Sequence, residues 1–275
     1  MNLSLALYSP PHGVRSWRAM IDLTADLGLH RLELLNAFEL AQPDPAAAEE
    51  LLCHARRRGV SFPCLSVFAD LMGEESALPQ LKQYVDLAGE MEIPLFHHTL
   101  VGSRTHADIA AHYEDYFSVA VESARELCDY AAAKGVRTVY EPQSYLLNGS
   151  RAIARFLEAV DRPVGLIADL ANPLFMEETA EPLLRRWGER VVHVHLKDMK
   201  RLPKGEPARY CSVNGYGLEP CPWGEGDAEG SAALSLLQEF SYHGCYSVEI
   251  NAQNPEELKD MIRKITEAKE KNHAF

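Results

Sequence analysis

The sequence lacks several features that mark secreted, membrane or disulfide-stabilised proteins. Its six cysteines include no CxxC pair, and no uncharged apolar run reaches membrane-spanning length. The first residues, MNLSLALYSPPHG, carry no basic stretch followed by a long apolar run. We therefore expect no signal peptide, and a cytoplasmic protein with reduced thiols. Cys211 and Cys221 share one segment and could pair under oxidation, but no other feature supports a disulfide.

Positive charge is also scarce. The chain has 27 Lys and Arg against 40 Asp and Glu, which gives a formal net charge of −13. A diffuse acidic surface repels phosphate backbones and anionic lipids, so we expect neither nucleic acid nor a membrane as a partner. A local basic pocket could still bind a small anionic substrate. Because 47% of the 275 residues are hydrophobic, a large core can be buried.

A glycine-rich nucleotide-binding turn is missing as well. The first apolar run ends in Ser9-Pro10-Pro11-His12-Gly13, which is not GxGxxG and argues against a doubly wound open sheet. Short apolar runs alternate with longer amphipathic ones, as expected for strands covered on both faces. Eight runs predict strands: LSLALYS from Leu3, RLELL from Arg31, SFPCLSV from Ser61, IPLFHHT from Ile93, RTVYEPQ from Arg137, VGLIADL from Val164, VVHVHLKD from Val191 and CYSVEIN from Cys245.

Helices are predicted between these runs. Asp44-Pro45 begins one that ends before Gly59, and Asn254-Pro255 begins another. A third has its apolar face at Phe117, Ala120, Val121, Ala124, Leu127, Cys128 and Ala131. Shorter helices are expected from about Ser16, Ala77, Ser150, Glu181 and Ser231. The fold class predicted is α/β, a single (β/α)8 TIM barrel over residues 1–275.

One connection differs from the rest. Residues 199–230 form a long stretch with aromatic and charged residues and without periodicity. Loops of this length are usually functional or disordered. Because the stretch follows the seventh strand, we expect a lid over the barrel mouth.

Polar residues occur at the ends of otherwise apolar strands. Glu141, Asp169, His195 and Glu249 lie at or near the C-terminal ends of the last four predicted strands. Those strands are neighbours in a barrel, and active sites of this fold lie at that face. Carboxylates held together repel one another unless they take up protons or a cation joins them. We expect one divalent metal, Mn²⁺ first, with Mg²⁺, Co²⁺ or Zn²⁺ as alternatives.

The segments VYEPQ, LIADLANPLF, HVHLKDMKR, WGEGD and YSVEIN resemble, in this order, the xylose isomerase-like superfamily of sugar-phosphate isomerases, epimerases and dehydratases. The family's metal ligands fall on Glu141, Asp169, His195 and Glu249. The resemblance implies proton transfer through an enediolate of a small sugar or polyol, with Glu141 and Glu249 as catalytic acid and base. Because barrels of this family are often dimers or tetramers, the resemblance also implies that the chain could form a homodimer or homotetramer.

Five further residues are candidates for substrate binding. Lys197 could stabilise an oxyanion or form a salt bridge with Asp198. Arg201 lies six residues after His195, where ketose epimerases of the superfamily carry a substrate-binding arginine. Alternation lets one of His97 and His98 face the barrel mouth, and we prefer His98. Glu225 matches a family loop, in either a structural or a chemical role.

Asn172, the fifth candidate, stands where the ketose 3-epimerases have a substrate-binding histidine, and Leu147 stands where they have a second glutamate. Both departures argue against a ketohexose 3-epimerase, and HVHLKD is closer to inosose dehydratases. The leading interpretation is a metal-dependent isomerase or epimerase of a ketose or sugar derivative. The alternative is a lyase that dehydrates an inosose or related keto-polyol.

Two other classes of protein fit the sequence less well. An apurinic-site endonuclease of the same superfamily needs extra histidine ligands, and Asn172 removes one of them. A non-catalytic sugar-binding barrel would not need the intact set of metal ligands.

Overall fold

The computed structural model describes residues 2–8, 10–73, 77–249 and 254–272, and of residues 268–272 it describes the backbone alone. Ser9, Ile250 and Asn251, which end two of the predicted strand segments, lie outside the described residues. Contacts divide the chain into two compact units. The first comprises Met1–Gly13, Glu141–Ile153 and Leu166–Phe275, and the second comprises Val14–Tyr140 and Ala154–Gly165.

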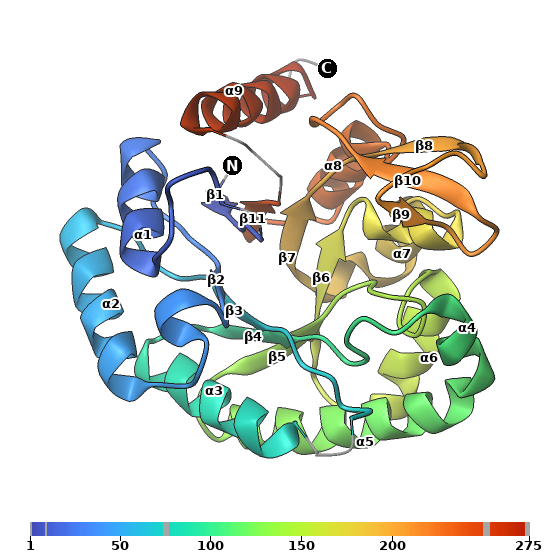
Figure 1. Cartoon of the computed structure of the whole chain (residues 1–275), viewed down its shortest axis with the longest axis horizontal. Helices are drawn as coiled ribbons and strands as arrows, with labels where there is room; N and C mark the ends of the chain where they lie inside the picture. Colours follow the sequence, from blue (N-terminus) through green and yellow to red (C-terminus); the bar gives the residue numbers. More distant parts are fainter. Residues whose placement is uncertain (1, 9, 74–76, 250–253, 273–275) are drawn as a thin grey trace. The chain divides into compact units, whose positions relative to one another are not determined.

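Parallel strands run through each unit (Figure 1). In the first unit their order is β1 (Asn2–Leu5), β11 (Cys245–Val248), β7 (Val191–Leu196) and β6 (Gly165–Asp169). In the second unit the order is β5 (Arg137–Tyr140), β4 (Leu95–His98), β3 (Cys64–Val67) and β2 (Leu34–Leu35). Each of the eight predicted apolar runs therefore overlaps a strand.

Helices connect the strands. The first unit has α7 (Glu181–Trp187), α8 (Gly230–Glu239), α9 (Pro255–Asn272) and the 3-10 helices η2 (Asn172–Met176) and η3 (Gly188–Arg190). The second unit has α1 (Trp17–Asp26), η1 (Phe38–Leu40), α2 (Pro45–Arg58), α3 (Leu78–Glu90), α4 (His106–Ala111) and α5 (Tyr113–Ala132). Helix α6 (Ser150–Val160) begins in the first unit and ends in the second. The sequence did not predict α4, which is a single short helix.

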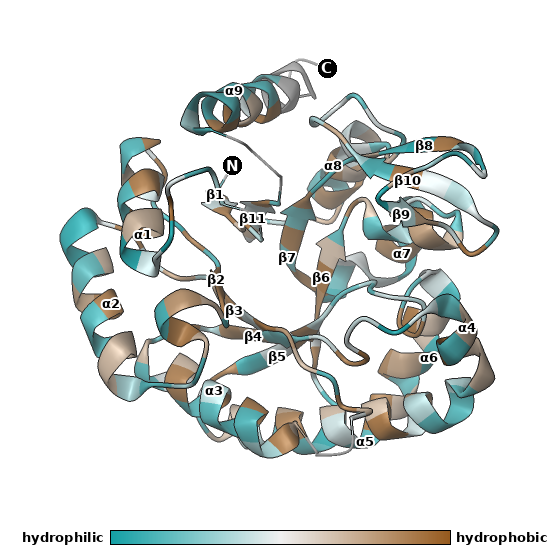
Figure 2. Ribbon diagram, in the orientation of Figure 1, coloured by the Kyte–Doolittle hydropathy of each residue, from teal (hydrophilic) through white to brown (hydrophobic). Residues whose placement is uncertain are grey.

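The boundaries of the predicted helices have clear local causes. The Asp44 carboxylate accepts hydrogen bonds from the backbone of Ala46 (2.9 Å) and Ala47 (3.4 Å), and Gly59 ends α2 in the left-handed region with a φ of 68°. In α5, all seven residues of the predicted apolar face are buried. Apolar side chains also dominate β6, all of whose residues are buried (Figure 2).

The segment 199–230 is more ordered than expected. It contains a three-stranded antiparallel sheet in the order β8 (Met199–Lys204), β10 (Tyr216–Pro220) and β9 (Tyr210–Cys211). The sheet lies on a small apolar cluster composed of Ala171, Leu174, Met199, Leu218 and Ala228, with Phe175 beside it. Most residues of β8 and both of β9 are exposed, so these strands show no clear hydrophobic alternation in the sequence.

Two expectations about composition can be compared with the structure. All six cysteines are free thiols, including Cys211 and Cys221. Among the described residues, no helix combines the length and the apolar character needed to cross a membrane.

Replacing the N-cap of α2 tests the local origin of this helix. We expect Asp44→Ala to lower the free energy of unfolding by about 1 kcal/mol, because two backbone N–H groups lose their acceptor. Denaturant unfolding followed by circular dichroism measures the change. Glu49→Ala, at an exposed position of the same helix, is the control. Equal stability of the two variants would contradict this assignment.

Candidate metal centre and active site

All four expected metal ligands belong to the first unit, and three of them lie at or next to the ends of its strands. Asp169 is the last residue of β6, and strand pairing sets it opposite His195 of β7. Glu249 directly follows β11, and its backbone N–H donates to the Leu196 carbonyl (3.0 Å). Glu141 follows β5 in the chain. Because parallel strands present their carboxyl ends at one edge, the side chains converge there.

The imidazole of His195 is the centre of the cluster. Its Nδ1 lies 3.0 Å from Glu141 Oε2, 3.0 Å from Glu249 Oε2 and 4.0 Å from Asp169 Oδ2. The side chains of His195 and Asp169 are inaccessible to solvent, and Glu249, the most exposed of the four, retains 11% exposure. The structure therefore brings together all four residues that the sequence selected.

The two oxygens of Asp169 have different surroundings. Oδ1 accepts hydrogen bonds from the backbone of Ala171 (2.8 Å) and Asn172 (2.7 Å). Oδ2 is buried, and among the described residues no donor lies within hydrogen-bonding distance of it. Lys197 Nζ is 3.7 Å away. A buried carboxylate oxygen without a hydrogen bond costs free energy unless a cation binds it.

These donors fit a divalent cation. One ligand atom from each of Glu141, Asp169 and His195 lies within 4.8 Å of the other two. Carboxylate oxygens and one imidazole nitrogen suit Mn²⁺, Mg²⁺, Co²⁺ or Zn²⁺. Glu249 Oε2 lies 3.0 Å from the same imidazole nitrogen.

Burial affects the two glutamates differently. It raises the pKa of Glu141 to about 7, although His195 opposes the shift. Burial also raises the pKa of Glu249, but the Lys197 ammonium and His195 outweigh it, so the net shift is downward. In the protein without metal, Glu249 is therefore the more readily ionised of the two carboxyl groups.

Lys197 belongs to the cluster rather than to an ion pair with its neighbour Asp198. Its Nζ lies 2.6 Å from Glu249 Oε1 and 3.3 Å from Asn172 Oδ1, to which it donates. Burial alone would lower the pKa of Lys197, but Glu249 and Asp169 raise it well above its ordinary value. The structure places Asn172 beside Lys197, and the predicted role of Lys197 in stabilising an oxyanion stays a prediction.

Arg201 lies on β8, where its guanidinium stacks 3.7 Å from the ring centroid of Tyr216. Its Nη2 is 3.5 Å from Glu177 Oε2, and 40% of the side chain is exposed. No contact joins Arg201 to the carboxylate cluster in the described part of the chain. Its predicted role in substrate binding therefore stays a prediction.

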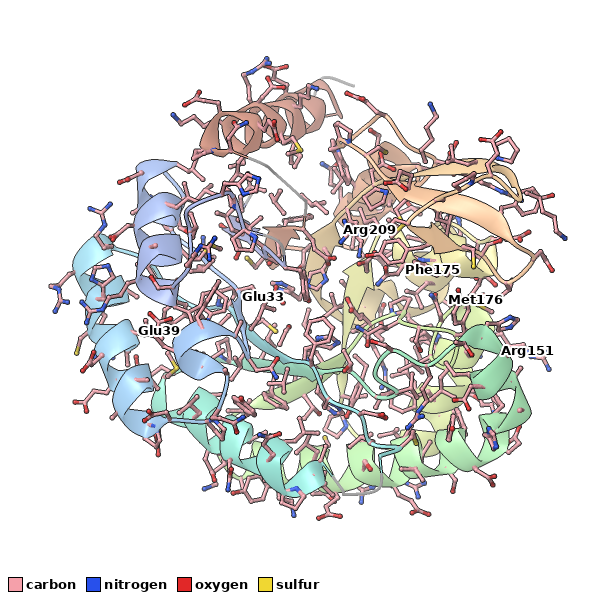
Figure 3. The ribbon with its side chains drawn as sticks, in the orientation of Figure 1. Glu33, Glu39, Arg151, Phe175, Met176 and Arg209 are labelled. Atoms are coloured by element: carbon pink, nitrogen blue, oxygen red, sulfur yellow. The ribbon has the colours of Figure 1, made fainter. Side chains whose placement is uncertain are left out.

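Glu225 is not brought to the cluster. Its side chain is 56% exposed and pairs with Lys264 of α9 at 3.3 Å. Aromatic residues of η2 and β9 pack on each other in the same unit. Phe175 of η2 packs on Tyr210 with ring centroids 5.6 Å apart, and the Arg209 guanidinium lies over the Tyr210 ring. Phe175 and Arg209 are labelled in Figure 3.

His98 and His97 make different contacts, and the predicted role of His98 in substrate binding stays a prediction. His98 Nε2 lies 3.1 Å from the hydroxyl of Tyr140, whose ring packs edge-on against Phe156 of α6. Burial lowers the pKa of His98 to about 4. His97 Nδ1 instead contacts Ser66 Oγ at 3.2 Å. Adjacent side chains of a strand point to opposite faces, so only one of the two histidines can point inward, but the sequence does not reveal which one.

Two contacts of the site were not foreseen. Gln143 donates to Glu141 Oε1 (3.1 Å), and its place two residues after Glu141 in VYEPQ was the available signal. His193 packs edge-on against His195, with ring centroids 5.4 Å apart, and contacts Ser247 Oγ at 2.9 Å. The alternation HVH was the signal that both histidines face the same side of β7.

The raised pKa of Glu141 predicts a pH-dependent stability of the metal-free protein. An acid with a raised folded-state pKa stabilises the fold fully below its ordinary pKa of 4.5, and this stabilisation is lost as the pH rises through about 7. We expect a loss on the order of 3 kcal/mol from about pH 4 to about pH 8. Denaturant unfolding of wild type and Glu141→Gln measures it, and saturating Mn²⁺ should reduce it. The same pH dependence in both proteins would contradict the assignment.

Comparison with known proteins finds two curated relatives, both named inosose dehydratase. The protein from Geobacillus thermodenitrificans is 25% identical over 59% of this chain and 53% of its own length. The protein from Clostridium perfringens is 25% identical over 66% of this chain and 61% of its own length. The matched region thus spans less than two thirds of either relative.

Solved structures share the fold. A xylose isomerase domain protein from Planctomyces limnophilus matches with a TM-score of 0.75 and 18% identity, over 97% of this chain and 95% of that one. The IOLI protein with a bound zinc atom matches with a TM-score of 0.74 and 18% identity, over 97% and 96%. D-Psicose 3-epimerase from Clostridium cellulolyticum H10 matches with a TM-score of 0.70 and 17% identity, over 91% and 85%.

A family model described as the xylose isomerase-like TIM barrel matches residues 13–268. This range includes every strand of the structure except β1, and all four residues of the cluster. The predicted fold class is confirmed, and the chain belongs to the xylose isomerase-like TIM barrel family.

Proposed function

We propose that this protein is a divalent-metal-dependent enzyme that removes a proton from the carbon beside the carbonyl group of a small keto-polyol. The proposal rests on one observation: the buried side chains of Glu141, Asp169 and Glu249 converge on the imidazole of His195. Perturbed titratable groups that converge at the strand ends of a barrel are typical of active sites. Two curated relatives with names that denote action on inososes support a substrate of this class.

Glu141, Asp169, His195 and Glu249 would hold the metal. When bound, it would supply Lewis acidity that polarises a carbonyl oxygen and acidifies the neighbouring C–H bond. We place Mn²⁺ first, and Mg²⁺, Co²⁺ and Zn²⁺ suit the same oxygen and nitrogen donors.

The two glutamates would transfer the proton. Glu141 and Glu249 each lie 3.0 Å from the same nitrogen of His195, so they flank one point of the site. Glu249 is paired with the Lys197 ammonium, whereas Glu141 accepts from the neutral amide of Gln143. This asymmetry suits Glu249 as the ionised base and Glu141 as the group that returns or relays the proton.

Two overall reactions share this first step. In an isomerase or epimerase, which the sequence alone placed first, the proton returns to carbon. In a dehydratase, a hydroxyl group on the next carbon leaves as water after taking up a proton. Lys197 favours the second outcome, because its buried ammonium, 2.6 Å from Glu249 and 3.3 Å from Asn172, can donate a hydrogen bond to the oxygen of a departing hydroxyl group, while Glu141 would relay the proton. We therefore place dehydration of a keto-polyol first and isomerisation second.

Replacing either glutamate tests the shared step. We expect Glu141→Gln and Glu249→Gln to slow deuterium uptake from D2O by about 10²-fold or more, because each loses a proton-transfer group. NMR of metal-loaded enzyme with keto-sugars, inososes and their phosphates measures the uptake. Glu206→Gln, an exposed acid of the 199–230 segment, is the control. Uptake near the wild-type rate in either variant, or full uptake after exhaustive chelation, would exclude this mechanism.

Lys197→Met separates the two overall reactions. For a dehydratase we expect elimination to fall by about 10²-fold or more while deuterium uptake at the carbon beside the carbonyl persists, because the base remains and the ammonium that stabilises the departing oxygen is lost. Ultraviolet absorbance of an enone or dicarbonyl product follows elimination, and NMR follows the exchange. A wild-type enzyme that yields only isomers would establish the isomerase instead.

A further inference from the structure

The connection between β7 and β8 consists of two residues, Lys197 and Asp198, whose side chains go to different places. Lys197 reaches Glu249 and Asn172 in the carboxylate cluster. Asp198 is buried, with 5% exposure, and contacts the loop that leads to α8. The bend thus joins Lys197 to the loop of residues 221–228.

The carboxylate of Asp198 is surrounded by backbone N–H groups. Its Oδ2 accepts from Gly224 (2.9 Å) and Gly226 (3.1 Å). Its Oδ1 accepts from Met199 (2.9 Å) and Ala228 (3.2 Å). Hydrogen bonds to an ionised acceptor are stronger than those between neutral groups. In the described part of the chain, no lysine or arginine forms an ion pair with Asp198, so these N–H groups solvate its charge.

Backbone hydrogen bonds also join the loop of residues 221–228 to the β7–β8 bend. The carbonyl of Asp198 accepts from Cys221 (3.2 Å), and that of Met199 accepts from Asp227 (2.9 Å). The Asp227 carboxylate in turn accepts from the backbone N–H of Arg201 (2.7 Å). The loop is therefore bonded to the bend on both sides of the carboxylate and to the first part of β8.

The enclosure of the Asp198 carboxylate by this loop explains why two positions of WGEGD are glycine. A Cβ atom on Gly226 would overlap Asp198 Oδ1 and lie 2.6 Å from the Met199 carbonyl oxygen. Gly224 has a φ of +83°, in the left-handed region that favours glycine. The loop can enclose the carboxylate only because both positions lack a side chain.

We propose that Asp198 is a positioning residue for the reaction, which keeps the β7–β8 bend in the one geometry that directs Lys197 to Glu249. The inference rests on the role of Lys197 given above as the proposed function. Lysine has a flexible four-carbon stem, so the place of its ammonium depends on where its backbone is held. A misplacement of about 1 Å can cost 10²-fold in rate.

Kinetics of Asp198→Asn tests the proposal. The amide keeps one acceptor oxygen and replaces the other with an N–H donor that faces backbone N–H groups. We expect kcat for elimination to fall by about 10-fold to 100-fold with KM changed less than about threefold. Gly226→Ala should give the same pattern without a change of charge, since its methyl group displaces the carboxylate. Glu206→Gln is the charge control. A wild-type kcat in both Asp198→Asn and Gly226→Ala would overturn the proposal.

A double variant shows whether Asp198 acts through Lys197. Residues that act as one unit are non-additive. We therefore expect Asp198→Asn combined with Lys197→Met to be no slower than Lys197→Met alone. If the two losses multiply instead, Asp198 acts independently of Lys197 and the proposal is wrong.

Amide hydrogen exchange provides a readout that needs no substrate. We expect the N–H groups of Gly224, Gly226 and Ala228 to be protected in the wild type and to exchange at least about 10-fold faster in Asp198→Asn. Unchanged protection would overturn the proposal. If Asp198→Asn loses this protection but the wild type processes no keto-polyol, Asp198 does hold the loop and only the proposed function is rejected. The two failures are therefore distinguishable.

Discussion

Electrostatic repulsion among buried carboxylates is the constraint on which the site depends. Glu141, Asp169 and Glu249 meet at the imidazole of His195 with little or no access to water. Such a group is stable only if protons, a neighbouring cation or a bound metal offset the charge. Lys197 supplies part of the compensation, and two backbone N–H groups supply more at Asp169.

The same compensation makes the site asymmetric. The ammonium of Lys197 lies beside Glu249, while Glu141 has the uncharged amide of Gln143. Two carboxyl groups in different surroundings can take different roles in proton transfer. The position of Lys197 is in turn coupled to the structure outside the cluster, because Asp198 bonds the adjacent bend to residues 221–228.

Some site residues could be predicted and others could not. Glu141, Asp169, His195 and Glu249 were predictable because each interrupts or ends an apolar strand and the ends of parallel strands meet. The choice between His98 and His97 could not be made from the sequence, because a pattern of period two leaves the direction of two adjacent histidines undecided. Glu225 lies in a loop without regular hydrogen bonding, where sequence spacing does not determine direction, and there it pairs with Lys264.

The sequence by itself determined the alternation of the eight parallel strands with helices and the polar residues at the strand ends, since hydrophobic periodicity and helix caps act over a few residues. The family followed from the resemblance of its ordered motifs. Only the tertiary structure decided that Lys197 pairs with Glu249, that Asp198 is enclosed by backbone N–H groups and that the segment 199–230 contains a sheet. The partners in these contacts are distant in sequence or lack apolar alternation. Their choice depends on burial and charge compensation, which exist only after the chain has folded.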